Sequence, residues 1–290
     1  MEPQDRMAAL FDSLADTYDA VGVDLFQPVA DGLVRALEPQ PGERALDVGC
    51  GRGAVLVRLA EAVTSTGAVT GVDLSLRMVE ATSADVAQAG LTWVDVVVGD
   101  ATVPALPAAT FDLVASSLVL FFLPDPLIAL RSWWALLVDG GRIGVSTFGP
   151  YDDRWREQVD ATLATFRPPE SRDARTTGSQ GPFASDEGME GLLTEAGFRD
   201  VHTVTTTVSP RFDDGAHWQR WSMSVGQRQF WDAIPEDRRS EVESAAFAAV
   251  ERCRKPDGRF GFDQEIRYTV GRRRDRVVRH DVIHLRSQPA

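Results

Sequence analysis

The sequence predicts an α/β protein built on a doubly wound, mostly parallel sheet that has helices on both faces and carries helical cap insertions. Two observations predict this fold. Between residues 41 and 148, short apolar runs that fit buried strands alternate with segments that fit helices, and this alternation is typical of a parallel sheet. A glycine-rich turn follows the first of these strands, where such folds bind ligands.

The composition fits one elaborated globular domain. The chain has 290 residues, of which 43% are hydrophobic and 25% are charged, so it can bury a sizeable core. Its net charge of -13 argues against a nucleic-acid partner, because binding a polyanion requires clustered cations. The N-terminus lacks a signal-peptide pattern, and the longest apolar run, 113–123, is too short to span a bilayer. We therefore expect a cytoplasmic protein without a membrane partner.

The N-terminal region is predicted to be helical. Apolar side chains recur at helical spacing between about residues 7 and 38, on two faces that are separated by Tyr18 and Asp19. Pro39 to Gly42 then breaks the helix before the first strand of the sheet.

The turn after the first strand favours a ligand that carries positive charge. Gly49, Gly51 and Gly53 let the backbone turn sharply and approach a ligand, and a helix from about Arg52 follows. A dinucleotide is the first alternative, but the spacing is G-x-G-x-G rather than G-x-G-x-x-G. Asp47, directly before the turn, would repel a pyrophosphate and suits an ammonium group.

Two further strands of the predicted sheet end next to a carboxylate. Asp73 ends the strand at 68–73, where it can accept hydrogen bonds from both hydroxyls of a ribose. Asp100 follows the strand at 94–98 and can accept from an exocyclic amine such as that of adenine. Together with Asp47, these residues predict a nucleoside-containing cofactor that also carries a cation.

Five sequence blocks together carry a resemblance to a known family. They read LDVGCGRG, GVDLS, VGDA, FDLVASSL and LLVDGGRIGVSTF, in family order and at family spacing. On these blocks the sequence resembles the class I S-adenosylmethionine-dependent methyltransferases, especially the menaquinone and ubiquinone type and its small-molecule relatives. The resemblance covers residues 44–148 and 185–208. It implies a Rossmann-like, seven-stranded sheet whose last two strands pair antiparallel, with S-adenosylmethionine as cofactor.

The same resemblance divides the chain into a core, a lid and two insertions that lie outside the common sheet. In the family, a Phe-x-x-x-Ala-x-x-Tyr-Asp stretch closes over the cofactor, and Phe11, Ala15, Tyr18 and Asp19 match it. A helix that is simply packed on the core is the alternative interpretation. The expected units are an N-terminal helical lid at 1–40, a cofactor-binding core at 41–148, 185–208 and 263–271, substrate cap insertions at 149–184 and 209–262, and a basic tail at 272–290.

The resemblance, the three carboxylates and the glycine turn give a set of expected cofactor contacts. The glycines and Asp47 are placed at the methionyl end, Asp73 at the ribose, and residues 99–101 around the adenine, against which Leu74 and Met78 can pack. The expected cofactor-binding residues are Tyr18, Asp47, Gly49, Gly51, Gly53, Asp73, Leu74, Met78, Gly99, Asp100, Ala101 and Ser116.

The sequence gives less direct evidence for the catalytic residues and for the substrate-binding residues. Many relatives carry a histidine after the fourth strand, but Phe121 and Phe122 stand there and cannot take a proton. His217 and Glu170 are the candidate bases, with His202 as a further alternative, and Glu170 can instead pair with a neighbouring arginine. The expected substrate pocket comprises Phe121, Trp155, Trp218 and Trp221, although tryptophans at this spacing also fit a packed core. No His, Cys or carboxylate cluster has ligand spacing, so no metal is expected.

These features predict methyl transfer to a small, largely apolar, natural-product-like acceptor at oxygen, nitrogen or carbon. The cofactor is chemically activated, so proximity and orientation can carry the reaction. One variant is C-methylation of a prenyl diphosphate or another anionic acceptor held by Arg167 and Arg172. Other classes are a biosynthetic cyclase that retains the cofactor, a cofactor-sensing module and an oxidoreductase. The sequence does not decide whether the protein forms a homodimer. The tail from residue 272 is either solvated or in contact with a partner subunit.

Overall fold

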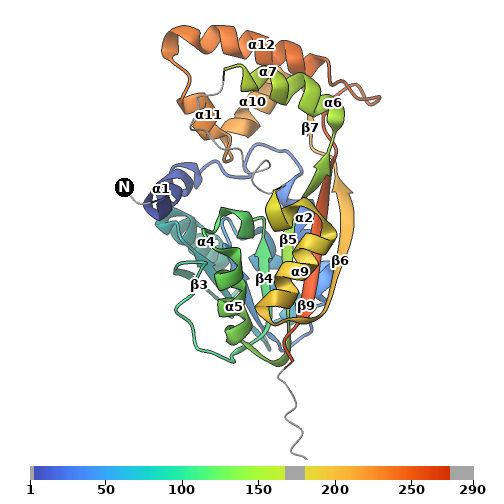
Figure 1. The fold of residues 1–290 in the computed structure, drawn as a ribbon. Helices are drawn as coiled ribbons and strands as arrows, with labels where there is room; N and C mark the ends of the chain where they lie inside the picture. The colour runs from blue at the N-terminus through green and yellow to red at the C-terminus, as the bar shows by residue number, and fades with distance from the viewer. Residues whose placement is uncertain (1–2, 167–179, 275–290) are drawn as a thin grey trace, which may run out of the picture.

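A seven-stranded sheet forms the centre of the computed structural model, which describes residues 3–166 and 180–274 (Figure 1). The strand order is β3-β2-β1-β4-β5-β9-β6, so β1 lies in the middle and β3 and β6 lie at the edges. The strands are β1 (Arg44–Val48), β2 (Ala68–Asp73), β3 (Val94–Val98), β4 (Phe111–Ser117), β5 (Leu137–Tyr151), β6 (Arg199–Val208) and β9 (Gln264–Arg272).

The direction of the strands confirms the predicted fold class. The first five strands of the chain pair in parallel, whereas β9 pairs antiparallel with both β5 and β6. Because β9 lies between two strands that run the other way, β6 points in the same direction as the parallel set. The carboxyl ends of β1, β2, β3 and β4 therefore share one edge of the sheet, where ligands of such folds bind.

Helices cover both faces of this sheet (Figure 1). α2 and α3 contact each other on one face, and α5 and α9 contact each other on the other face. The predicted N-terminal helical region is two helices, α1 and α2, because the chain leaves helical geometry between them at residues 15–25. The helices around the sheet are α1 (Pro3–Leu14), α2 (Phe26–Leu37), α3 (Ala54–Val63), α4 (Leu76–Gln88), α5 (Pro126–Leu136) and α9 (Asp186–Ala196).

A second group of elements stands over the carboxyl edge of the sheet, and we call this group the cap (residues 153–166 and 211–261). α1 lies between the cap and the sheet (Figure 1). The helices of the cap pack around buried tryptophan and phenylalanine side chains. The cap elements are α6 (Asp153–Trp155), α7 (Ala161–Ala164), β7 (Arg211–Phe212), α10 (Gly215–Met223), α11 (Arg228–Asp232), α12 (Arg239–Glu251) and β8 (Phe260–Gly261). Among the described helices, none has the length and apolarity needed to cross a bilayer.

The cap is joined to the sheet by charged side chains at the strand connections. Asp263, directly before β9, accepts hydrogen bonds from Ser209 Oγ (2.7 Å), Arg211 Nη2 (2.8 Å) and Lys255 Nζ (3.0 Å). Lys255 also pairs with Asp152 at the end of β5. Burial alone would raise the pKa of Asp263, but the hydrogen bonds from these neighbours outweigh it and lower the pKa to about 2. The junction is therefore strongest when this carboxyl group is ionised.

We predict that the cap loosens in acid and that Asp263 contributes to this change. The pKa of Asp263 is lower in the folded than in the unfolded chain, so its stabilisation is present above about pH 4 and is lost as the pH falls toward 2. In Asp263→Asn, this part of the acid dependence disappears. Tryptophan fluorescence between pH 5 and 2 measures it, with exposed Asp237→Asn as the control; identical acid transitions in the three proteins would contradict the prediction.

Candidate active site

The glycine turn after β1 has a backbone conformation that requires glycine at its first position. Gly49 has a φ of 74°, and a Cβ there would lie 2.4 Å from Val119 Cγ2, so this position excludes every other residue. Gly51 also has positive φ, but a Cβ there would meet no described atom within 4 Å. At its start the turn is thus packed against the segment that follows β4. At Gly51 it faces open space, three residues before α3 begins, where a helix leaves its first N–H groups without partners inside the helix.

Asp47 lies beneath this turn and is almost fully buried, with 1% of its surface exposed. Its Oδ2 atom has no hydrogen-bond partner among the described residues. Burial, together with the nearby charge of Asp73, raises the pKa of Asp47 to about 8. A buried carboxyl group with an unpaired oxygen next to open space is a binding position for a ligand cation, because pairing offsets the cost of its desolvation.

Asp73 at the end of β2 is the second buried carboxylate, and it differs from Asp47 in its partners. Its Oδ2 accepts a hydrogen bond from Gly51 N (2.8 Å) and its Oδ1 accepts one from Ser75 N (2.9 Å). Burial raises its pKa, while these backbone hydrogen bonds act in the opposite direction. Asp73 thus fixes the glycine turn against the start of α4 while each of its oxygens keeps a lone pair for a ligand hydroxyl.

The other predicted contacts at the strand ends surround the same edge. Asp100 Oδ1 accepts from Thr102 N (2.7 Å), and the Ala101 carbonyl accepts from Trp133 Nε1 (2.7 Å), which fixes the loop after β3. Gly99 N donates to the Asp73 carbonyl (2.9 Å), so this loop and the end of β2 are adjacent. Ser116 is buried at the end of β4, where its hydroxyl donates to the Val48 carbonyl. Leu74 is half-buried and Met78 is buried.

The N-terminal segment (residues 3–25) lies over this edge. Asp12 accepts from Ser75 Oγ (2.6 Å) and Arg77 N (3.1 Å) at the start of α4, and Arg52 in the glycine turn donates to the Ala15 carbonyl (2.7 Å). Tyr18 packs on Phe26 with 4.9 Å between ring centroids. Burial raises the pKa of the Tyr18 hydroxyl, with smaller contributions from Asp19 and from Asp73. Sequence reasoning missed Asp12 and Arg52, although Asp12 falls inside the motif that begins at Phe11.

Beyond β4, four phenylalanine side chains pack together. Phe121 lies 4.8 Å from Phe122 and 5.4 Å from Phe148, measured between ring centroids, and contacts Phe183 edge-on at 6.2 Å. Phe122 in turn contacts Phe11 of α1 at 6.0 Å. We call Phe121, Phe122, Phe148 and Phe183 the aromatic wall; through Phe11 it reaches the segment that covers the three strand ends.

The predicted tryptophans of the substrate pocket lie higher, inside the cap. Trp155 and Trp218 are each 1% exposed and Trp221 is 4% exposed. Trp155 contacts Phe262 (5.0 Å) and Trp218 (6.1 Å), again between ring centroids. These side chains form the core of the cap, so of the four predicted pocket residues only Phe121 belongs to the aromatic wall.

The two histidines among the candidate bases make other contacts in the described structure. His217 Nδ1 accepts from Asp213 N (3.3 Å), and its Nε2 contacts the Val21 carbonyl (3.0 Å). His202 is exposed on the edge strand β6. Glu170, Arg167 and Arg172 lie outside the described residues. Within the described part of the chain, no group of His, Cys, Asp and Glu side chains could hold a metal ion.

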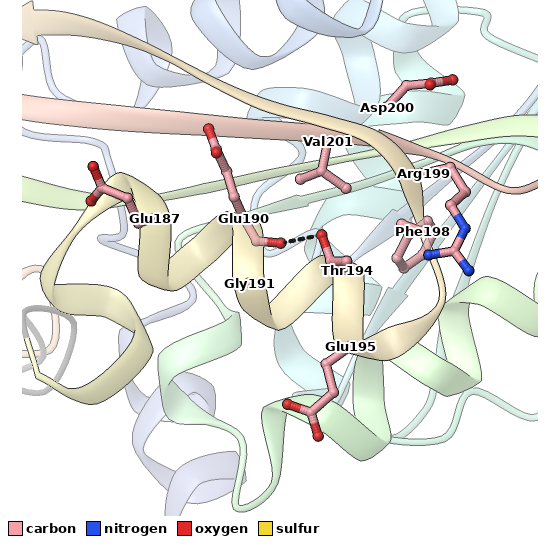
Figure 2. Close-up of a pocket in the computed structure, with 9 residues that line it drawn as sticks. All are labelled: Glu187, Glu190, Gly191, Thr194, Glu195, Phe198, Arg199, Asp200 and Val201. Atoms are coloured by element: carbon pink, nitrogen blue, oxygen red, sulfur yellow. Dashed lines mark hydrogen bonds between the residues drawn. The ribbon is translucent and has the colours of Figure 1, made fainter.

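A separate groove lies on the outer edge of the sheet, along α9 and the start of β6 (Figure 2). β6 is four strand positions from β1, which places this groove roughly 19 Å from the glycine turn. Four of its lining residues are acidic and only Arg199 is basic. The lining includes neither the glycine turn nor the buried carboxylates at the strand ends. The lining residues are Glu187, Glu190, Gly191, Thr194, Glu195, Phe198, Arg199, Asp200 and Val201.

Comparisons with known proteins agree with this geometry. Residues 46–145 match the model of a methyltransferase domain family. Nocamycin O-methyltransferase of Saccharothrix syringae is 38% identical over 249 residues, which are 80% of this chain and 86% of that protein. An aklanonic acid methyltransferase of Streptomyces sp. strain C5 is 43% identical over 142 residues, 49% of this chain and 64% of that protein. The YcgJ protein of Bacillus subtilis, a solved structure, has a TM-score of 0.58 at 17% identity and covers 86% of this chain and 99% of its own, which supports the fold alone.

We predict that Asp47→Asn stabilises the ligand-free protein in a pH-dependent way. Because the pKa of Asp47 is about 8 in the folded chain and near 4 in the unfolded chain, the unfolded state loses its proton first. The cost to folding therefore grows from about pH 4 to pH 8, by at most roughly 1.4 kcal/mol per pH unit. Urea unfolding at pH 5 and pH 8 measures the gain, which should be larger at pH 8; an equal gain at both values would contradict the prediction.

Proposed function

The chain belongs to the class I S-adenosylmethionine-dependent methyltransferases, and from this membership we propose that it methylates an oxygen atom of a small, largely apolar, natural-product-like acceptor. The observation that carries the proposal is the aromatic wall beyond β4, which begins two residues after Val119, whose side chain lies against Gly49 of the glycine turn. The relatives support it, since their names associate them with the small molecules nocamycin and aklanonic acid and one of them is an O-methyltransferase.

The residues at the strand ends fit the cofactor. We propose that Asp47 pairs with the ammonium of the methionyl group above the open turn at Gly51 and that Asp73 accepts hydrogen bonds from the ribose hydroxyls. Asp100, Ala101 and Leu74 surround the adenine in this assignment, and Tyr18 covers the site from the N-terminal segment. When bound, S-adenosylmethionine supplies a methyl group that is already activated by the positive sulfur.

The remaining task of the protein is to orient the acceptor and to exclude water. Orientation of two reactants can lower a barrier by roughly 7 to 11 kcal/mol, so no dedicated base is required in principle. The aromatic wall suits a flat apolar acceptor, because aromatic faces pack well on such rings and offer no competing proton acceptor. The cap above it keeps water away. Since both ring nitrogens of His217 have backbone partners, we do not assign it the role of base.

The decisive experiment is incubation of the protein with methyl-labelled S-adenosylmethionine and a panel of phenolic and carboxylic polyketide-type acceptors. Mass spectrometry should detect a product with one added methylene mass and an equal amount of demethylated cofactor. Fragmentation then places the methyl group on oxygen, or else on nitrogen or carbon. A converted product without cofactor turnover would instead indicate a cyclase, and binding without any conversion would indicate a sensor.

We predict that Asp73→Ala weakens cofactor binding by about 10- to 100-fold. The substitution removes a charged acceptor from the proposed ribose contact and also the group that holds Gly51 N, and hydrogen bonds to charged groups contribute about 1.5 to 3 kcal/mol. Titration calorimetry with S-adenosylhomocysteine measures the dissociation constant. Asp95→Ala, at an exposed position of β3, is the matched control; equal affinity of the two variants would refute the assignment of Asp73.

We predict that one aromatic substitution changes the Michaelis constant for the acceptor and that another changes the stability of the fold. Phe122→Ala, at the half-buried edge of the aromatic wall, should raise the Michaelis constant for the acceptor about tenfold through loss of apolar contact. Trp218→Ala, in the core of the cap, should instead lower the free energy of unfolding by about 3 to 5 kcal/mol. Steady-state kinetics and urea unfolding on both variants test this difference; a Phe122→Ala enzyme with an unchanged Michaelis constant would remove the aromatic wall from the acceptor site.

A further inference from the structure

Two arginine side chains, one from the cap and one from the glycine turn, donate hydrogen bonds to carbonyl groups at the C-terminal end of α1. A helix end leaves carbonyl groups without partners inside the helix, and basic side chains can complete them. The Ser13 carbonyl accepts from Arg228 Nη1 (3.1 Å) of α11 in the cap, and the nearby Ala15 carbonyl accepts from Arg52 Nη1 (2.7 Å) of the glycine turn. One short stretch of backbone therefore links the cap to the proposed cofactor site.

His217 of α10 makes a second contact between the cap and the N-terminal segment. His217 Nε2 lies 3.0 Å from the Val21 carbonyl oxygen, and because a carbonyl oxygen only accepts, Nε2 is the donor in this hydrogen bond. Nδ1 faces Asp213, 3.3 Å from both its backbone N and its Oδ2. The imidazole is only 12% exposed and packs edge-on against Phe212, which fixes its direction. The contact joins residues that are 196 positions apart in the chain.

On its other side, the N-terminal segment is held by the core. Leu14 and Ala15 are buried against Met78 of α4, and Asp12 bonds the N-terminus of that same helix. Arg52 also pairs with Asp85 near the end of α4. The segment thus lies between the proposed cofactor site and the cap, with polar contacts to both (Figure 1).

We propose that His217 and Arg228 are positioning residues through which the cap holds the N-terminal segment closed over the cofactor site. The proposal rests on the proposed function, because the ligand retained there is S-adenosylmethionine or its demethylated product. Asp47 and Asp73 are 1% and 9% exposed, and the segment is bonded to Ser75 and Arg52 beside them, so we expect a ligand of this size to enter and leave when the segment moves. Single hydrogen bonds to backbone carbonyls are strong enough to favour the closed state and weak enough to release it.

This arrangement couples the two binding sites. In the closed state the segment has its contacts with the cap, and in the open state its carbonyls return to water. A ligand that orders the cap therefore also favours the closed segment, and by linkage a bound cofactor favours the ordered cap to the same extent. Acceptor binding would in this way slow the loss of cofactor before methyl transfer.

The test compares variants that remove the two donors with variants that keep them. His217→Leu and Arg228→Met remove the hydrogen bonds, whereas His217→Gln and Arg228→Lys keep a donor at a similar distance. His202→Leu and Arg238→Met are the matched controls, because His202 lies on β6 and Arg238 pairs with Glu241 inside the cap. For each full-length protein, calorimetry gives the dissociation constant for S-adenosylhomocysteine, and hydrogen exchange gives the protection of amides in residues 12–25 and 54–63.

We expect each removal to raise the dissociation constant about fivefold, the ratio that corresponds to about 1 kcal/mol for one hydrogen bond. Exchange in residues 12–25 should accelerate by a similar factor in the ligand-free protein, while exchange in α3 (residues 54–63) stays unchanged and shows that the core is folded. The donor-keeping variants and the controls should resemble the wild type.

Unchanged affinity and unchanged exchange in residues 12–25 of the donor-removing variants would overturn the proposal while leaving the methyltransferase assignment intact. A wild-type protein that does not bind S-adenosylhomocysteine would instead overturn the proposed function. In that case exchange in the ligand-free variants still decides whether the cap holds the segment. Equal loss of affinity in the donor-keeping variants would reduce both residues to packing roles and would also reject the proposal.

Discussion

The close approach of two buried carboxyl groups, Asp47 and Asp73, is the constraint on which the active-site region depends. Burial disfavours the charge of each and raises the pKa of both, and the charge of Asp73 raises the pKa of Asp47 further. Both oxygens of Asp73 accept hydrogen bonds from backbone N–H groups, one of the glycine turn and one of the residue that caps α4. Asp47 keeps an unpaired oxygen. The site is thus stable enough to fold and still gains free energy when a cationic ligand arrives.

This asymmetry explains why the surroundings are closed rather than open to water. A buried charge pair between protein and ligand is strong only where water is excluded, because the effective dielectric constant falls with burial. In the proposed function, the N-terminal segment, the aromatic wall and the cap provide that exclusion. The segment is joined to α4 by Asp12 and Ser75, to the cap by Arg228 and Ser13, and to the wall by the ring contact of Phe11 with Phe122. A dry site that must exchange its ligand requires a cover of this kind, held by weak and separate bonds.

The sequence alone was sufficient for the sheet and for the positions of the carboxylates, because each depends on local signals. A strand that ends in an acid, or a turn with three glycines, is encoded within a few residues, as at Asp73 and Gly49 to Gly53. Contacts across the chain carry no such signal. Asp12 and Ser75 are 63 positions apart, and His217 and Val21 are 196 apart, so neither pair could be read from spacing. The tryptophans of the cap were ambiguous for a related reason: helical spacing shows that a side chain is buried but does not show whether a ligand or another side chain buries it.

The aromatic wall shows how substrate choice can vary while the cofactor site stays constant. Phe121 and Phe122 have side chains that cannot take a proton, and His217 is occupied by contacts with Asp213 and Val21. Recognition on this wall must come from shape and apolar contact, which act on the ground state and on the transition state alike and mainly set which acceptor is held. Rate must then come from alignment with the methyl donor, which depends on how rigidly the cap and the N-terminal segment close. In the proposed function, the polar groups therefore serve the cofactor and its cover, and the aromatic side chains would select the acceptor.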